Sequence, residues 1–243
     1  MYDKSSEYYD ISELETWKTK KIVLGKISKL FANVQYPILD IGAGTGKVAI
    51  EVATNAKDAE ILAVEPSLVM RTAFLSKLSL HHYDDIRNRI TIIPSDIQNF
   101  EYKGRIGGVI CDGVIGHLSE EERRQLWRKL SEVLVPNAPM FIGLLNPKMK
   151  DAQIGTMLSV NYVGKNRYET TIKNKECIGS NLYQWTLEYN IFNGDTVISG
   201  YEDKMKWQFI EMDILMNELS DYGFKGGKIS ESMLTFIKDG KSA

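Results

Sequence analysis

The chain has 243 residues, of which 43% are hydrophobic and 26% charged, with a formal net charge of −2 and a pI of about 6.0. This length and apolar content suit one α/β domain with an insertion better than two full domains. The acidic balance argues against a large basic surface for nucleic acid, and no apolar run reaches the roughly 18 residues of a membrane helix.

The cysteines and the first residues indicate the compartment. Cys111 and Cys177 have neither zinc nor redox spacing, so no metal site is predicted and a reducing environment is favoured. The segment 1–6 lacks the apolar core of a signal peptide. We therefore expect a soluble cytoplasmic protein with no membrane partner.

A helix signal opens the chain. Ser12 and Glu15 have the spacing of a capping box, in which the serine caps the helix and the glutamate lies three residues later. A helix with one apolar face is therefore predicted from Ser12 to about Phe31.

The stretch after this helix is the most informative of the chain. An apolar strand over 38–41 runs into a loop with glycine at every second position, and helix-period apolar residues follow over 47–53. Glycine at that density lets the backbone turn tightly and approach a ligand. The order of strand, glycine loop and helix is typical of the nucleotide-binding turn of an α/β sheet.

Further strands alternate with helices up to about residue 146. The second strand ends at Glu65, the third precedes Asp96 and the fourth ends at Asp112; a second capping box joins Ser119 and Glu122. The predicted strands are 61–64, 90–93, 108–111 and 140–145. This alternation predicts a doubly wound, mainly parallel sheet.

The sequence period changes after the fifth strand. Apolar and polar residues alternate over 183–191, Asn193-Gly194 is a hairpin turn signal, and a returning strand extends to about residue 209. Residues 155–178 are expected to add one or two strands. An antiparallel β insertion is therefore predicted, followed by a last helix over 212–222 and a final strand over 232–237.

Two cofactors compete for the glycine loop. The dinucleotide fingerprint G-x-G-x-x-G needs a third glycine at position 47, which is Lys47, so NAD is disfavoured. The spacing present is D-x-G-x-G-x-G, from Asp40 to Gly46. With this loop, Glu65 and the later strands in register, the chain resembles the class I S-adenosylmethionine (SAM) dependent methyltransferases. The β insertion resembles that of small-molecule N-methyltransferases.

The resemblance implies a fold, a cofactor and a set of binding residues. The fold is an α/β, doubly wound, mainly parallel seven-stranded Rossmann-like sheet with an antiparallel β insertion after strand five, and the cofactor is SAM, with S-adenosylhomocysteine (SAH) as product. Asp40 matches the acid that orients the glycine loop, Glu65 the acid that accepts from the ribose, and Asp96 the acid that accepts from the adenine amino group. The other predicted cofactor contacts are Tyr9, Trp17, Gly42, Ala43, Gly44, Pro66, Met70, Ile97, Cys111 and Asp112.

Several of these residues also have structural interpretations. Glu65 could cap the next helix, Asp96 could be a turn residue, and Met70 could be a core residue. Cys111 is interpreted as a buried strand residue, because the Pro-Cys pair of nucleophilic family members is missing. His117 is the one candidate catalytic base, with packing and capping of the next helix as the alternative.

The predicted reaction is methyl transfer to a small molecule or short peptide, at an amine, because a neutral amine needs no base. DNA is excluded as a partner, since residues 111–114 read Cys-Asp-Gly-Val instead of the DNA amino methylase motif. An RNA methyltransferase, disfavoured by the acidic pI, and a non-catalytic SAM-binding regulator are the alternatives. The chain is expected to be a monomer or a homodimer.

The chain is expected to divide into four functional segments. Residues 1–34 form an N-terminal helical lid, 35–148 the SAM-binding core, 149–210 the insertion (a substrate lid or dimer surface), and 211–243 the end of the core. Acceptor choice is expected to lie in the first segment and the insertion, because both lie outside the strand-and-helix repeat and are rich in Tyr and Trp.

Overall fold

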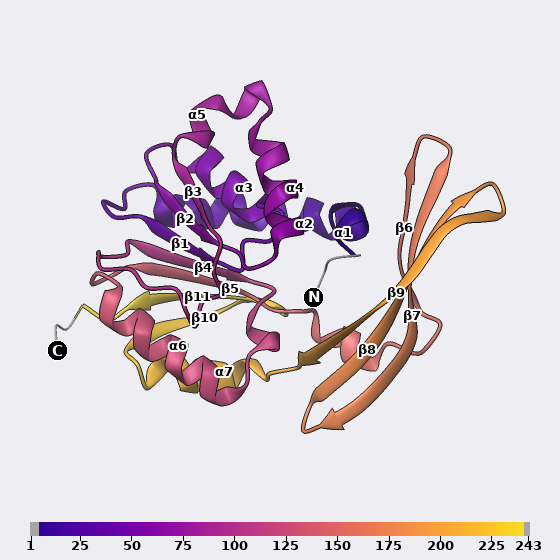
Figure 1. The fold of residues 1–243 in the computed structure, drawn as a ribbon. Helices are drawn as coiled ribbons and strands as arrows, with labels where there is room; N and C mark the ends of the chain where they lie inside the picture. The colour runs from indigo at the N-terminus through magenta and orange to yellow at the C-terminus, as the bar shows by residue number, and fades with distance from the viewer. Residues whose placement is uncertain (1–4, 241–243) are drawn as a thin grey trace. The chain divides into compact units, whose positions relative to one another are not determined.

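A computed structural model describes residues 5–240 (Figure 1). The chain forms two compact units: one contains residues 5–21 and Pro147–Phe209, the other Ile22–Asn146 and residues 210–240. None of the helices in the described part has the length and apolar character needed to cross a membrane.

The larger unit is built on a seven-stranded sheet in the order β10-β11-β5-β4-β1-β2-β3. Its strands are β1 (Ile38–Ile41), β2 (Ile61–Val64), β3 (Ile90–Ile93), β4 (Gly108–Asp112), β5 (Pro139–Gly143), β10 (Phe224–Ser230) and β11 (Met233–Lys238). The first five strands pair in parallel, and β11 runs antiparallel to both β5 and β10. The predicted doubly wound, mainly parallel sheet is confirmed.

Helices cover both faces of this sheet (Figure 1). One face carries α3 (Lys47–Asn55), α4 (Leu68–Leu78) and α5 (Asp84–Arg87), and the other carries α6 (Glu120–Val133) and α7 (Met212–Ser220). Short 3₁₀ turns occupy Ser28–Phe31, His81–Tyr83, Ile115–His117 and Pro147–Asp151. Alternate strand residues such as Leu39, Cys111 and Ile142 join one apolar cluster with residues of α6 and α7. The carboxyl ends of β1, β2 and β4 are thereby fixed at one edge.

A buried ion pair joins the two helices of the second face. Arg123 of α6 donates from Nε and Nη2 to the two carboxylate oxygens of Glu218 in α7, at 3.0 and 2.6 Å. Both side chains are almost wholly buried, and Trp127 Nε1 donates to the same carboxylate at 3.3 Å. Arg123 Nη1 also donates to the carbonyl of Leu118 at 3.1 Å, so the pair fixes the turn before α6.

The smaller unit is an antiparallel sheet in the order β6-β7-β8-β9, with the N-terminal helix packed on it. Its elements are α1 (Ser6–Ser12), β6 (Met157–Val163), β7 (Asn166–Gly179), β8 (Leu182–Asn193) and β9 (Thr196–Gln208), and α2 (Leu14–Ile27) crosses the boundary between the units. The turn predicted at Asn193-Gly194 joins β8 to β9, with Gly194 at φ +61.

Tyr8 anchors α1 to this sheet. Its ring is fully buried and lies 5.6, 5.2 and 5.3 Å from the rings of Tyr168, Tyr189 and Tyr201. Ser5 Oγ donates to Asp203 Oδ2 at 2.9 Å on the same sheet. These contacts group residues 5–21 with the insertion, whereas the sequence predicts a separate N-terminal segment over 1–34. The role of that segment as a lid stays a prediction.

The predicted capping box at Ser12 is wrong. Helix α1 begins at Ser6 and Ser12 is its last residue, after which α2 starts at Leu14. The Ser12 hydroxyl lies 3.0 Å from Thr170 Oγ1 of β7, and this distant partner replaces the local cap.

Strand β10 was not predicted from the sequence. Its residues Gly226 and Gly227 interrupt the alternation that marks a strand. A side chain at Gly226 would overlap the backbone of Thr235 and Phe236 in β11, so glycine is needed for the two strands to approach each other.

Candidate cofactor site

Three carboxylates meet at the carboxyl edge of the parallel sheet. Asp40 lies in β1 opposite Ala63 of β2 and Ile110 of β4, while Glu65 directly follows β2 and Asp112 ends β4. Strand register therefore brings Asp40, Glu65 and Asp112 to the same edge, where the glycine loop begins. Ligands of open α/β sheets bind in the crevice outside this edge.

The glycine loop has a backbone that only glycine adopts without strain. Gly42, Gly44 and Gly46 have φ values of +66, +56 and +80. A side chain at Gly42 would meet Val114 Cγ2 at 2.5 Å, and one at Gly46 would overlap the ring of Phe74. At Gly44, by contrast, only the carbonyl of Gly42 lies near, at 3.9 Å, so this part of the loop presents backbone to open space.

Glu65 fastens the loop to the neighbouring strand. Its Oε2 accepts from the backbone N–H of Gly44 at 2.8 Å, and its Oε1 accepts from the N–H of Ser67 at 2.7 Å. The side chain is buried, and Arg71 Nη1 donates to the backbone carbonyls of Glu65 and Pro66. A carboxylate oxygen accepts two hydrogen bonds, so each oxygen keeps capacity for a ligand hydroxyl. The bond from the Ser67 N–H agrees in part with the interpretation that Glu65 caps the next helix. The remaining acceptor capacity still allows Glu65 to bind the ribose.

Asp40 lies deeper in the same cluster. It is 2% exposed, and its Oδ2 has no hydrogen-bond partner in the described part of the chain. Burial, and to a smaller extent the nearby carboxylates of Asp112 and Glu65, together raise the pKa of Asp40 to about 8. An unpartnered buried oxygen is costly, so Asp40 is the residue of this site that most requires a ligand.

Asp112 extends the cluster toward β5. Its carboxyl lies over Gly143, its register partner, where a side chain would overlap Oδ1 of Asp112. Gly113 has φ +69 and donates from its N–H to the Gly143 carbonyl at 2.9 Å. Sequence reasoning missed both Val114 and Gly143, because their contribution is the space they fill or leave beside another strand.

Cys111 is confirmed as a buried strand residue. It is fully buried in β4, and burial raises the pKa of its thiol well above the usual range, with the carboxylates of Asp40 and Asp112 adding to the effect. A thiol that stays protonated is a poor nucleophile.

Asp96 and Ile97 follow β3, the strand that pairs with β2. Asp96 accepts from the N–H and the Nδ2 of Asn99 at 2.8 and 2.9 Å, and these bonds lower its pKa. Ile97 is buried, with its carbonyl 3.3 Å from Lys129 Nζ. Asp96 is therefore an ionised turn residue as well as a half-buried candidate for the adenine contact.

The remaining predicted residues occupy different environments. Met70 is 2% exposed within α4, and Pro66 is exposed just before the N-cap of that helix, Ser67. His117 is half-buried at the end of a 3₁₀ turn, and its N–H donates to the Val114 carbonyl at 2.9 Å. Tyr9 and Trp17, both half-buried, belong to the smaller unit, and their contact with the cofactor stays a prediction.

The comparisons with known proteins agree with this geometry. A family described as "Methyltransferase domain" matches residues 38–137, which carry the glycine loop and all three carboxylates. Residues 38–137 are thus similar to a methyltransferase domain. An uncharacterized methyltransferase of Oceanobacillus iheyensis is 27% identical over 128 residues, which are 52% of this chain and 55% of that protein. The match thus spans about half the length of that relative.

Solved structures extend the likeness to the whole fold. DesVI of Streptomyces venezuelae superposes with a TM-score of 0.74 at 15% identity, over 95% of this chain and 97% of that one. CalS10 of Micromonospora echinaspora, an amino pentose methyltransferase solved with SAM bound, gives 0.73 at 12% identity over 98% of both chains. The predicted resemblance to class I SAM-dependent methyltransferases is confirmed, and SAM is the cofactor of that class.

Proposed function

We propose that this methyltransferase transfers a methyl group from SAM to an amine of a small molecule or short peptide. The assignment of SAM as the cofactor rests on the hydrogen bond from the N–H of Gly44 to Glu65. This bond joins the glycine loop after β1 to the acid that follows β2. An amine acceptor is supported by structural neighbours, which include a sugar N-methyltransferase of Streptoalloteichus and a glycopeptide N-methyltransferase.

The residues at the sheet edge fit this cofactor. Asp40 offers a buried, unpartnered carboxyl oxygen to the ammonium of the methionine part, and Gly44 leaves open space above the loop backbone. Glu65 has acceptor capacity left for two ribose hydroxyls, and the carboxylate of Asp96 is available for the adenine amino group. The ammonium, the ribose hydroxyls and the adenine amino group of the cofactor thus each have a matching acceptor in this unit.

The chain's own residues have a limited catalytic task. SAM, when bound, supplies a methyl carbon on a sulfonium, from which a neutral thioether leaves as the amine nitrogen forms its new bond. The protein must align the donor and the lone pair, which is mainly a positioning task. Burial next to Asp112 and the Gly143 backbone would keep water away. His117 is the candidate to take the proton that the product ammonium loses.

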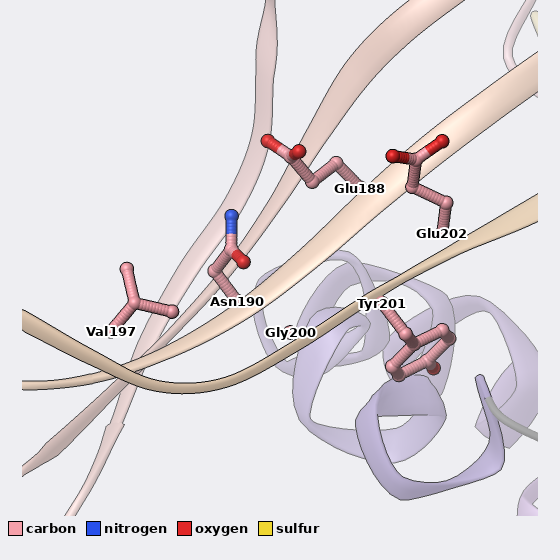
Figure 2. Close-up of a pocket in the computed structure, with 6 residues that line it drawn as sticks. All are labelled: Glu188, Asn190, Val197, Gly200, Tyr201 and Glu202. Atoms are coloured by element: carbon pink, nitrogen blue, oxygen red, sulfur yellow. The ribbon is translucent and has the colours of Figure 1, made fainter.

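The insertion is the proposed source of acceptor specificity. Figure 2 shows Glu188, Asn190 and Glu202 rising from one face of β8 and β9, while Tyr201 points to the other face. The first face holds an open hollow of about 580 Å³, with Lys173 donating to Glu188 and Glu202 at 3.0 and 2.6 Å. The second face carries Tyr189, Tyr201 and Trp185, and Trp185 is 1% exposed and has no partner for Nε1 in the described part.

Replacing Trp185 with phenylalanine is expected to change acceptor KM more than SAH affinity. The variant removes the buried N–H donor but keeps an aromatic ring against Phe209, so the sheet should stay folded. Losing one hydrogen bond to the acceptor would raise KM about fivefold to tenfold. The measurement is initial rates on an amine identified by SAH release from a panel of amino sugars, amino acids and short peptides. Phe192→Leu, on the face of β8 that holds the hollow, is the comparison variant and should keep the wild-type KM. Equal KM values for Trp185→Phe and wild type would show that Trp185 does not bind the acceptor.

A further inference from the structure

The carboxyl groups of Asp40, Glu65 and Asp112 lie together at the sheet edge where the cofactor is proposed to bind, and the inference drawn from them rests on that proposed function. We propose that Asp40 holds a proton in the ligand-free protein and releases it when the cationic methionine end of the cofactor binds. Binding of SAM or SAH would then be coupled to pH through this one carboxyl group.

Geometry is the first support. Asp40 is 2% exposed in the middle strand of the parallel sheet, and its Oδ2 has no partner in the described part of the chain. An ionised carboxylate in such a position would lack the hydrogen bonds that normally stabilise a buried charge. The neutral acid avoids most of that cost.

The neighbouring groups are the second support. Asp112 of β4 and Glu65 after β2 are acids, and Cys111 of β4 is a buried thiol whose pKa is raised partly by Asp40. Two cations of α4 donate to backbone carbonyls of the loops at this edge: Arg71 to those of Glu65 and Pro66, and Lys77 to that of Thr45. Together with burial, the two acids raise the pKa of Asp40 to about 8.

The sign of the linkage follows from these groups. An acid whose pKa is raised in the ligand-free state binds a proton there at pH 7, while an ammonium placed against Oδ2 favours the ionised form. The proton passes from the Asp40 carboxyl to buffer as the ligand binds. Affinity therefore rises as the pH increases toward 8, and it falls as the solution becomes more acidic.

Isothermal titration calorimetry with SAH tests this inference on the whole chain. Titrations at pH 7 in phosphate, HEPES and Tris, whose ionisation enthalpies differ, give the number of protons released. We expect about 0.9 protons per site and a dissociation constant that falls about tenfold between pH 6 and pH 7, where the ligand amino group stays protonated.

Two variants assign the proton to its residue. Asp40→Asn keeps the shape but cannot titrate, so proton release and the pH dependence should both vanish. Asp112→Asn removes one charge that raises the Asp40 pKa, so the pH dependence should persist but be shifted to lower pH. If Asp40→Asn fails to fold, the shift in Asp112→Asn alone decides the assignment.

The outcomes separate this inference from the function on which it rests. SAH binding without proton release, or unchanged release in Asp40→Asn, would overturn the inference and leave the cofactor assignment standing. Absence of SAH binding at every pH would overturn both.

Discussion

Replacing Glu65 with alanine is expected to weaken SAH binding about a hundredfold while leaving a folded protein. The variant removes the acceptor of Gly44 N–H and the predicted acceptor of the ribose hydroxyls. Hydrogen bonds to a charged acceptor contribute about 1.5–3 kcal/mol each, so two lost ligand bonds correspond to about 3 kcal/mol or more. Calorimetric dissociation constants, with circular dichroism as a check of folding, provide the measurement.

Glu60→Ala is the matched control for this experiment. Glu60 is an exposed acid directly before the same strand, and within residues 5–240 it accepts a hydrogen bond through its backbone carbonyl, from the N–H of Ile38. We expect its SAH affinity to equal that of wild type. If Glu65→Ala also binds SAH with wild-type affinity, Glu65 lies outside the cofactor site and serves only to fasten the loop.

Replacing Glu218 with alanine is expected to lower the free energy of unfolding by about 3–5 kcal/mol. Arg123 would then keep its charge in a site where 3% of its side chain is exposed, and Trp127 Nε1 would lose its acceptor. Breaking a buried pair is costly because the remaining charge is uncompensated, whereas the pair as a whole contributes far less. Urea denaturation followed by circular dichroism measures the change.

Two further variants identify the cause of that loss. Asp213→Ala breaks an exposed ion pair of the same helix, with Lys228 at 2.8 Å, and should cost less than about 1 kcal/mol. The double variant Arg123→Met with Glu218→Leu removes both buried charges and should recover most of the stability. A double variant as unstable as Glu218→Ala would show that lost packing, and not the loss of the opposite charge beside Arg123, causes the effect.

Much of the parallel sheet could be predicted from the sequence because its signals are local. The apolar run 38–41, the glycines that follow it and the capping box at Ser119 each specify a conformation within a few residues. The spacing of the glycines at 42, 44 and 46 predicted a tight loop without tertiary information, and in the structure all three have positive φ.

The features that sequence reasoning missed depend on distant partners. Ser12 pairs with Thr170, and Tyr8 packs among three tyrosines of the insertion. The first helix therefore begins before the residue that the local sequence pattern predicts, and it belongs to the same unit as the insertion. Strand β10 contains adjacent glycines and exists because β11 lies against it. In the site, the positions of the acids were predictable, but the unpartnered oxygen of Asp40 and the space over Gly143 were not, since both arise from the packing of neighbouring strands.

The most direct test of the central claim is a calorimetric titration of the wild-type protein with SAH and, separately, with NAD. The glycine loop, Glu65 and Asp40 form one site that is matched to the polar groups of SAH, and Lys47 replaces the glycine that a dinucleotide would require. We expect SAH to bind with a dissociation constant on the order of micromolar and NAD neither to bind nor to compete. Tight binding of NAD with no heat from SAH would contradict the account.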